Sequence, residues 1–248
     1  MHHFDLKNRQ AIITGGAQGF GLDIAKKFLK SGAKVRIWDI DQKELKKVIN
    51  SENNPNLNFD IVDVSDFNNV NRVVKEIIKN SKIDILINNA GINMVSPINE
   101  IDEKYLDEIY KVNLRGPIIM TKEISKIMIK KRRGKIINIS SIFGTVGKSG
   151  RSLYSSTKFG LVGLTKSASL DLAKYNILVN TISPGVINTG LTKKVLNSVE
   201  EKRIKKDIPL KKLGKASDVS YLVCFLCSDF NNYITGQNFI IDGGYTSK

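Results

Sequence analysis

Three residues near the middle of the chain carry side chains that together could move a proton. Tyr154 and Lys158 are four positions apart, and Ser141 lies thirteen residues before the tyrosine. An offset of four places two side chains on one face of a helix, one turn apart. A lysine ammonium beside a phenol favours the phenolate, so we expect Lys158 to lower the pKa of Tyr154 toward the working range. Such a tyrosine can exchange a proton with a substrate oxygen that a serine hydroxyl holds in place.

This chemistry fits the reduction of a ketone or the oxidation of a secondary alcohol, provided that another group supplies or accepts the hydride. Tyr-x-x-x-Lys is a weak signal by itself, because the same spacing arises by chance on surface helices. A second motif, close to the N-terminal end of the chain, supports the same chemistry.

That second motif is a glycine-rich turn between an expected strand and an expected helix. Residues 10–14 form an apolar run typical of a buried strand, and residues 22–29 have apolar positions at helical spacing. Glycines let the backbone turn tightly and let a phosphate approach, and the first N–H groups of a helix face an anion. The order strand, turn, helix therefore predicts a site for the pyrophosphate of a dinucleotide. The turn residues that we assign to it are Gly15, Gln18, Gly19, Phe20 and Gly21.

An acidic residue ends the next expected strand, Lys34–Trp38. Asp39 follows the glycine turn at a distance of about 20 residues, where a carboxylate suits the ribose 2′-hydroxyl of NAD. The same charge would repel the 2′-phosphate of NADP. Gln18 and Ile40 stand where a basic residue could form an ion pair with that phosphate, and neither is basic. We therefore expect NAD to be preferred over NADP. Asp41 is a competing candidate for the role of Asp39.

Expected strands and helices alternate along the whole chain, which indicates a parallel sheet with helices on both faces. The longest expected helices lie around Glu103–Ile129 and at Ser152–Ala173. Ligands of such folds bind at the carboxyl ends of the strands, and the motifs described above fall there. After the first two, the expected strands are Asn58–Val62, Asp84–Ile87, Lys135–Ile139, Ile177–Ile182 and Asn238–Ile241.

In content and order these motifs resemble those of the short-chain dehydrogenase/reductase family, over nearly the whole chain. Besides the glycine turn and the Tyr154–Lys158 pair, the resemblance rests on Asp63-Val64, Asn88-Asn89-Ala90-Gly91, Val112-Asn113, Ile139-Ser140-Ser141, Pro184-Gly185-Val186-Ile187-Asn188-Thr189, Thr235-Gly236-Gln237 and Asp242-Gly243-Gly244. It implies an α/β doubly wound Rossmann fold, with a seven-stranded parallel sheet, helices on both faces and a single NAD-binding domain over residues 1–248.

The resemblance also implies a role for each matching residue. Tyr154 would be the acid/base, and Lys158 would lower its pKa and hold the nicotinamide ribose. Ser141 would polarise the substrate oxygen, and Asn113 would hold a water that links Lys158 to solvent. None of these four residues is substituted, which argues against a regulatory cofactor sensor. The implied cofactor contacts beyond the glycine turn are Asp39, Ile40, Asp63, Val64, Asn89, Ala90, Gly91, Tyr154, Lys158, Pro184, Gly185, Ile187 and Thr189.

Two substrate classes compete within this activity. Preference for NAD favours a sugar, polyol or hydroxy acid, because cells keep NAD mostly oxidised. The alternative is a 3-oxoacyl thioester on acyl carrier protein or coenzyme A, for which the basic run Lys130–Lys135 could be a docking patch. Tyr175 weakens that alternative, because it stands where carrier-binding relatives often have a basic residue. The family resemblance further implies a mobile substrate lid over residues 190–213.

Composition restricts the other function classes. The net charge of +15 permits nucleic-acid binding, but aromatic residues make up 7% of the chain and no binding motif is found, so this is a remote alternative. No apolar run reaches 18 residues, which argues against a membrane-spanning helix, and the start lacks a signal-peptide pattern. We therefore expect a cytoplasmic protein. The family resemblance implies a homotetramer.

The two cysteines have a spacing that also occurs in zinc sites and redox pairs. Cys224 and Cys227 fall on an expected core helix that begins near Ser217, and no second pair completes a zinc site. We predict buried free thiols and no metal site. His2 and His3, at the chain start, have no partner that would make them metal ligands.

Overall fold

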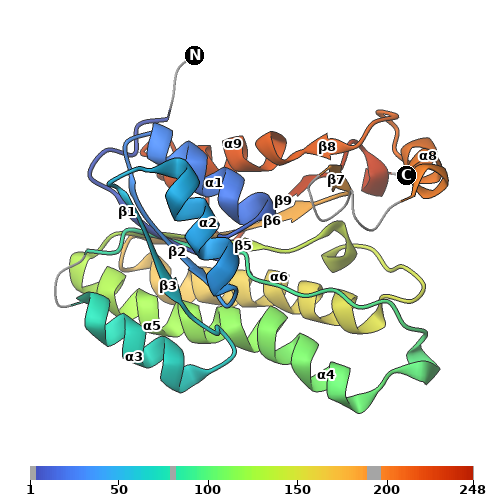
Figure 1. Cartoon of the computed structure of the whole chain (residues 1–248), viewed down its shortest axis with the longest axis horizontal. Helices are drawn as coiled ribbons and strands as arrows, with labels where there is room; N and C mark the ends of the chain where they lie inside the picture. Colours follow the sequence, from blue (N-terminus) through green and yellow to red (C-terminus); the bar gives the residue numbers. More distant parts are fainter. Residues whose placement is uncertain (1–3, 79–81, 189–196, 248) are drawn as a thin grey trace.

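The computed structural model describes residues 4–78, 82–188 and 197–247. Its centre is a sheet of seven parallel strands in the order β3-β2-β1-β4-β5-β6-β9, with helices on both faces (Figure 1). The strands are β1 (Gln10–Thr14), β2 (Lys34–Asp39), β3 (Leu57–Ile61), β4 (Ile85–Asn88), β5 (Gly134–Ile139), β6 (Ile177–Pro184) and β9 (Asn238–Ile241). The structure confirms the predicted doubly wound α/β fold and each of the seven predicted strands, whose ends differ by two residues at most.

The central strands are continuous apolar runs because both of their faces are buried. Every residue of β4 and β6 is buried. Alternate side chains along each strand enter opposite cores: in β1, Ile13 joins the core under one helical layer and Ile12 joins the core under the other. Neighbouring strands keep these sets in register, since Ile12 pairs with Leu86 and Ile13 pairs with Ile87.

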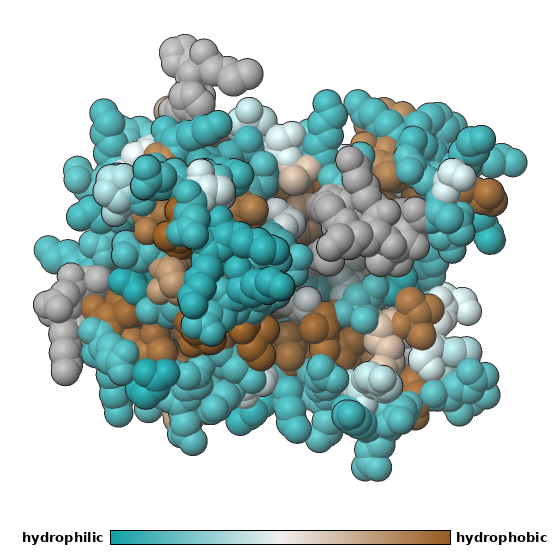
Figure 2. Space-filling model, viewed as in Figure 1, coloured by the Kyte–Doolittle hydropathy of each residue, from teal (hydrophilic) through white to brown (hydrophobic). Residues whose placement is uncertain are grey.

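Two helical layers cover the sheet (Figure 1). The first contains α1 (Gly19–Lys30), α2 (Gln42–Glu52) and α9 (Ala216–Cys227). The second contains α3 (Phe67–Ile78), α4 (Glu103–Tyr110), α5 (Gly116–Lys131) and α6 (Ser152–Ala173). Hydrophilic side chains cover most of the face shown in Figure 2, and apolar side chains gather in a band between the two layers. None of the helices in the described ranges combines the length and the apolar composition needed to cross a bilayer.

The helix predicted around Glu103–Ile129 is interrupted in the structure. A π-helical turn, η2 (Lys111–Arg115), separates α4 from α5, and it contains the buried Asn113. Single π-turns inserted in α-helices are frequent at functional sites. The sequence pattern missed this break because a π-turn adds one residue without disturbing the apolar periodicity on either side.

Helix α9 packs beside α1 on the same face of the sheet, with its apolar side chains inward. Cys224 and Cys227 are both buried and both free, which confirms the prediction of core thiols. Burial raises the pKa of Cys224 to about 12 and raises that of Cys227 well above its ordinary value. Both side chains therefore stay protonated and pack as small apolar groups.

The remaining elements lie around the carboxyl ends of β6 and β9. A second sheet pairs two short parallel strands, β7 (Ile187–Asn188) and β8 (Gly214–Lys215), and the exposed helix α8 (Ser198–Asp207) precedes β8. Short 3₁₀ turns complete the fold at η1 (Ile98–Glu100), η3 (Ile142–Gly144) and η4 (Tyr245–Ser247).

The connections change direction between β1 and β4. From β1 the chain moves outward to β2 and β3, and it then returns to place β4 on the other side of β1. The loops after β1 and β4 therefore diverge at the carboxyl edge of the sheet. This is the topological position at which open α/β sheets form ligand-binding crevices.

Candidate active site

The glycine turn after β1 is fixed to the loop after β4 by side-chain hydrogen bonds. The amide Nδ2 of Asn89 donates to the carbonyl oxygens of Thr14 and Gly15, at 3.0 and 2.9 Å. The hydroxyl of Thr14 accepts from the backbone N–H groups of Asn89 and Ala90, at 3.0 and 3.1 Å. The sequence assigned Asn89 to cofactor contact, and in the structure its side chain is used to hold the turn. Thr14 belongs to the same brace and was not predicted as a site residue.

Two glycines of the turn are required for different reasons, one for close packing and one for its backbone conformation. A Cβ on Gly21 would lie 2.3 Å from the carbonyl oxygen of Gly15, so close packing of helix and turn requires glycine there. Gly19 has a φ of +58°, and a Cβ on it would meet nothing within 4 Å. Gly19 therefore faces open space with a backbone conformation that favours glycine.

The start of α1 next to this space fits a pyrophosphate. The exposed side chain of the N-cap residue Gln18 makes no capping hydrogen bond to the first N–H groups, and the first turn contains no acidic residue. The N–H groups at the start of a helix and the helix dipole together favour an anion. Phe20 packs partly buried against the core on the α1 side, so it offers its backbone rather than its ring to such a ligand.

Asp39, at the end of β2, is attached to the same turn. Its carboxylate accepts from the backbone N–H of Ala17 at 3.1 Å and from that of Asp41 at 3.1 Å. The competing candidate, Asp41, is the N-cap of α2 and accepts from the N–H groups of Lys43 and Glu44. Asp39 is therefore the strand-end carboxylate that adjoins the glycine turn. Ile40 beside it is 69% exposed, which leaves its side chain free to contact a ligand.

The turn after β3 holds the predicted pair Asp63 and Val64. The carboxylate of Asp63 accepts from the backbone N–H and the hydroxyl of Ser65, at 2.8 and 2.7 Å. Val64 is buried against Gly116, where α5 begins. Both side chains are thus engaged in shaping the turn, and the backbone N–H of Asp63 is held by the Oδ1 of Asn69 at 2.9 Å.

The structure brings Ser141, Tyr154 and Lys158 together at the carboxyl end of β5. Ser141 follows the strand, and Tyr154 and Lys158 lie on α6. The Nζ of Lys158 donates to the carbonyl oxygen of Ile139 at 2.9 Å and lies 5.5 Å from the centre of the Tyr154 ring. A hydrogen bond joins Tyr154 and Ser141. Tyr154 and Lys158 therefore share one face of α6, and Ser141 lies near Tyr154, as the sequence predicts.

The pKa values of this cluster differ from the expectation that Lys158 lowers the pKa of Tyr154. Burial raises the pKa of Tyr154, and the hydrogen bond with Ser141 and the charge of Arg151 oppose that rise. Burial also lowers the pKa of Lys158 to about 8. Both groups lose water, so each disfavours its own charged form. In this arrangement the cation that favours the phenolate is Arg151, a residue that the sequence analysis did not single out.

Asn113 makes its contacts with the loop that follows β4. Its fully buried side chain pairs with the backbone of Ile92 and donates to the hydroxyl of Thr157 at 3.3 Å. A Cβ on Gly91 would lie 3.3 Å from the Asn113 Oδ1 and 3.6 Å from the Lys158 Nζ. Asn113 therefore holds the loop that passes next to Lys158, and its amide is engaged with protein groups.

The loop after β6 supplies the remaining predicted contacts. Pro184 is buried at the end of the strand, and the N–H of Gly185 donates to the carbonyl of Ile241 at 2.8 Å. A Cβ on Gly185 would lie 2.9 Å from the backbone of Asp242, so glycine permits this approach. The side chain of Ile187 is buried in the core and only its backbone could face a ligand. Thr189 lies outside the described residues.

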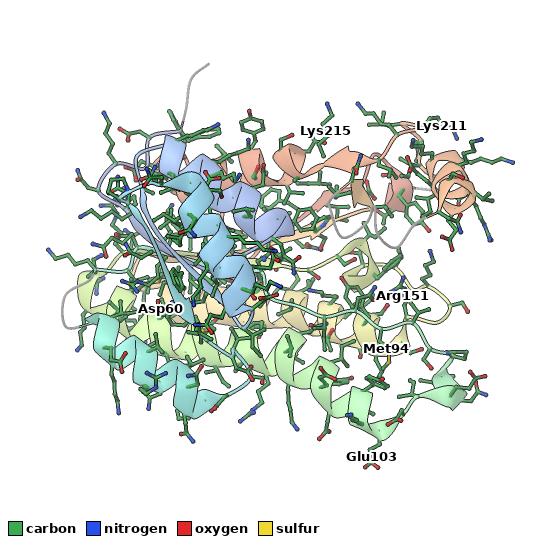
Figure 3. The ribbon with its side chains drawn as sticks, in the orientation of Figure 1. Asp60, Met94, Glu103, Arg151, Lys211 and Lys215 are labelled. Atoms are coloured by element: carbon green, nitrogen blue, oxygen red, sulfur yellow. The ribbon has the colours of Figure 1, made fainter. Side chains whose placement is uncertain are left out.

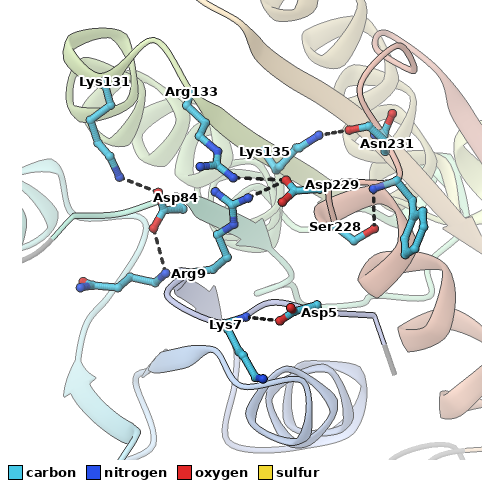
Figure 4. A network of polar contacts seen from close by, with 12 residues as sticks. Asp5, Lys7, Arg9, Asp84, Lys131, Arg133, Lys135, Ser228, Asp229 and Asn231 are labelled. Carbon is cyan, nitrogen blue, oxygen red and sulfur yellow. Dashed lines mark hydrogen bonds and ion pairs between the residues drawn. The ribbon is translucent and has the colours of Figure 1, made fainter. Parts of the chain in front are cut away.

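The basic run Lys130–Lys135 lies at the amino end of β5, and Ser141 follows the carboxyl end of that strand. Figure 4 shows Lys131, Arg133 and Lys135 in a network of polar contacts. Lys131 pairs with Asp84 at 2.5 Å, Arg133 pairs with Asp229 at 3.2 Å, and Lys135 donates to the carbonyl of Asn231. The length of β5, about 20 Å, separates this run from Ser141. A carrier docked at this run would sit about one strand length from Ser141, and the docking role of the run stays a prediction.

Three comparisons with known proteins agree with this geometry. A family model described as "Enoyl-(Acyl carrier protein) reductase" matches residues 15–246. The 3-oxoacyl-[acyl-carrier-protein] reductase FabG of Chlamydia pneumoniae is 36% identical over 244 residues, which cover 97% of this chain and 98% of that protein. An NAD-dependent glycerol dehydrogenase of Listeria innocua is 37% identical over 247 residues, covering 99% and 96%. Among solved structures, a gluconate 5-dehydrogenase from Burkholderia cenocepacia in complex with NADP and tartrate has a TM-score of 0.93 at 29% identity, covering 99% of this chain and 98% of that chain.

Proposed function

The chain belongs to the short-chain dehydrogenase/reductase family, and from this premise we propose that it transfers hydride between NAD(H) and a secondary alcohol or ketone of a sugar, polyol or hydroxy acid. The coarser activity, oxidation or reduction at a CH–OH group with a pyridine nucleotide, is common to the relatives it matches. NAD as the preferred cofactor and the small hydroxylated substrate are the specific parts of the proposal.

Asp39 is the observation that carries the preference for NAD. Its carboxylate is fixed to the N–H of Ala17 and so lies beside the turn that would hold the pyrophosphate. A 2′-phosphate placed there would meet a negative charge at short range. Arg36, the basic residue of the same strand that lies nearer to Asp39, is held by two hydrogen bonds to the carboxylate of Asp60, at 2.9 and 2.8 Å. Arg36 is therefore paired with Asp60 and does not form an ion pair with a 2′-phosphate.

We assign the catalytic roles to the cluster at the carboxyl end of β5. A bound nicotinamide supplies or accepts the hydride. Tyr154 gives its phenolic proton to the substrate oxygen in reduction or takes it back in oxidation, and Ser141 holds that oxygen through its hydroxyl. Lys158, buried and donating to Ile139, keeps a proton next to Tyr154. Asn113 fixes the loop that adjoins Lys158, and a water held by its turn would connect the lysine with solvent.

We also propose one cofactor-binding domain over residues 1–248, with a substrate lid at residues 190–213. Residues 190–196 lie outside the described part of the chain. Of the rest, α8 is exposed along most of its length, and Ile208 anchors the segment after it by packing against Gly243. An exposed, charged helix anchored at one end near the carboxyl ends of β6 and β9 suits a cover over a substrate.

We further propose that the protein is a homotetramer and that it is located in the cytoplasm. Large apolar side chains are exposed on the long helices: Ile118 of α5 is 44% exposed, and Phe159 and Leu170 of α6 are 47% and 79% exposed. Contacts between copies of these helices would remove that apolar surface from water.

A second candidate function is reduction of a 3-oxoacyl thioester, which the 36% identity to a FabG protein favours. An acidic carrier would dock on cations, either at the basic run Lys130–Lys135 or nearer to Ser141 and Tyr154. Exposed cations of this kind are present on and after α8, at Lys202, Arg203, Lys206, Lys211 and Lys212.

The deciding experiment is a fluorescence titration with NADH and NADPH, followed by turnover assays with a panel of alcohols, hydroxy acids and acetoacetyl-coenzyme A. Tighter binding of NADH with turnover of small hydroxylated substrates would support the first function. Tighter binding of NADPH with turnover of acetoacetyl-coenzyme A would move the thioester activity to first place. No turnover of that thioester with either cofactor would exclude the second candidate.

A further inference from the structure

Arg151 stands at the start of the helix that carries the catalytic tyrosine. It is the N-cap residue of α6, three positions before Tyr154, and its carbonyl accepts from the N–H of Ser155 at 2.7 Å. Its guanidinium donates to the Oδ1 of Asn93, which lies in the loop after β4. In Figure 3, Arg151 lies at the same edge of the molecule as Met94, the residue after Asn93.

The two loops that meet at Arg151 are attached to each other. The N–H of Ser96 donates to the carbonyl of Gly150 at 3.0 Å. Gly150 has a φ of +72°, and a Cβ on it would lie 3.2 Å from a methyl group of Val95. This close contact fixes the backbone next to Arg151, and the hydrogen bond to Asn93 holds the guanidinium.

The charge of Arg151 is half-buried and has no carboxylate partner in the part of the chain that the structure describes. The segment 189–196 contains no Asp or Glu, so its sequence cannot supply one. Asn93 is a neutral acceptor and uses one of the five N–H donors of a guanidinium. Charges taken partly out of water are normally paired, because desolvation of an unpaired ion is costly. The remaining donors therefore suit an anion that comes with a ligand.

The ligand anion must lie close to the reacting carbon. Arg151 and Tyr154 interact electrostatically, and burial lowers the pKa of Arg151 while Tyr154 opposes that change. A group that contacts the guanidinium is consequently near the oxygen to which Tyr154 delivers its proton. The planar fork of arginine matches a carboxylate with two parallel hydrogen bonds.

We propose that Arg151 is the carboxylate-binding residue of the substrate site, positioned by Asn93, and that the substrate is a hydroxy acid or the corresponding oxo acid rather than a neutral polyol. This inference rests on the proposed function and narrows it to one substrate class. The carboxylate of the substrate neutralises Arg151 and orients the carbinol toward Tyr154 and Ser141.

Pairs of substrates that differ in the carboxylate test the assignment. Gluconate is compared with sorbitol, and glycerate with glycerol, by kcat/KM with NAD at the pH optimum of each variant. We expect the wild-type protein to favour one or more acids at least tenfold over the neutral partner. Arg151→Gln should lower kcat/KM for the acid roughly ten- to a hundredfold, mainly through KM, because a charge-assisted contact is lost. The ratio of acid to neutral substrate should then approach one.

Two further variants separate this role from a general effect of charge. Arg151→Lys keeps the charge without the fork and should recover part of the acid preference. Lys148→Gln removes one positive charge from an exposed position of the same loop and should leave the ratio as in the wild type. Equal kcat/KM for acids and neutral partners in the wild type, an unchanged ratio in Arg151→Gln, or a preference for glycerol 3-phosphate over glycerate would overturn the inference.

Failure of the proposed function has a different result. If the protein binds NADH but oxidises neither acids nor polyols with either cofactor, the proposed function itself fails. If it oxidises neutral polyols as well as acids, the proposed function stands and only the assignment of Arg151 is wrong.

Discussion

The side-chain amide of Asn113 exchanges two hydrogen bonds with the backbone of Ile92, each 2.8 Å long. The N–H of Ile92 donates to the amide oxygen, and the amide nitrogen donates to the carbonyl of Ile92. Asn113 lies in the π-helical turn between α4 and α5, so this pair ties that turn to the loop after β4. The loop carries Gly91, whose backbone passes close to the Lys158 ammonium.

Removal of this amide should destabilise the protein. Asn113→Ala leaves both polar groups of Ile92 without their partner, so we expect the free energy of unfolding to fall by about 1–3 kcal/mol in urea titrations. Asn68→Ala, at an exposed position of α3, is the matched control and should change it by less than about 0.5 kcal/mol. Equal effects of the two substitutions would contradict the bracing role of Asn113.

Tyr154→Phe should separate catalysis from cofactor binding. In the proposed mechanism the phenol transfers the proton, so kcat should fall at least a hundredfold, as expected for loss of a general acid/base. The affinity for NADH, measured by fluorescence, should stay within about twofold of the wild type, since a single contact of this size contributes little to so large a ligand. Tyr105→Phe, with a ring that is 49% exposed, is the control. A Tyr154→Phe protein with normal turnover would remove the phenol from the mechanism.

Lys158→Met should alter the pH dependence of stability. The pKa of Lys158 is about 8 in the folded protein and near 10.4 in an unfolded chain. Below pH 8 both states carry the proton and the full cost of burying the charge is present. Between pH 8 and about 10.4 the unfolded chain binds more protons, so stability rises with pH as that cost fades.

The methionine variant has no such titration. The difference in unfolding free energy, wild type minus Lys158→Met, should therefore increase by roughly 2 kcal/mol between pH 7 and pH 10. Urea titrations at the two pH values measure it, and Lys166→Met, exposed on the same helix, is the control. A difference that stays constant with pH would show that Lys158 is not held in the desolvated state described here.

Two substitutions of Asp39 should separate its charge from its hydrogen bond to Ala17. Asp39→Asn keeps an acceptor for the N–H of Ala17 and removes the charge, so the ratio of NADPH to NADH affinity should rise roughly tenfold. Asp39→Ala removes both, so it should also weaken NADH binding, because the glycine turn loses its support. Titration of each variant with both cofactors measures these effects. No change in the ratio for Asp39→Asn would mean that this carboxylate does not select the cofactor.

The sequence by itself determined the fold class and most of the site, because both depend on local patterns. Strands buried on two faces are continuous apolar runs, so each was recognisable, and the residues after them necessarily meet at the carboxyl edge of a parallel sheet. The shared face of Tyr154 and Lys158 follows from helical spacing alone. The glycine turn was identified by its place between a strand and a helix.

Other properties were decided by contacts between residues far apart in the chain. The bond from Ala17 to Asp39, the use of Asn89 as a brace and the π-turn at Asn113 depend on how neighbouring loops pack. The pKa of Tyr154 is set by burial, which no local pattern reports. The sheet places the basic run Lys130–Lys135 at its amino edge, and the fold leaves Arg151, one helical turn before Tyr154, without a carboxylate partner among the described residues. Burial, direction and charge pairing arise from the whole packed structure, and for this reason the tertiary structure alone could assign them.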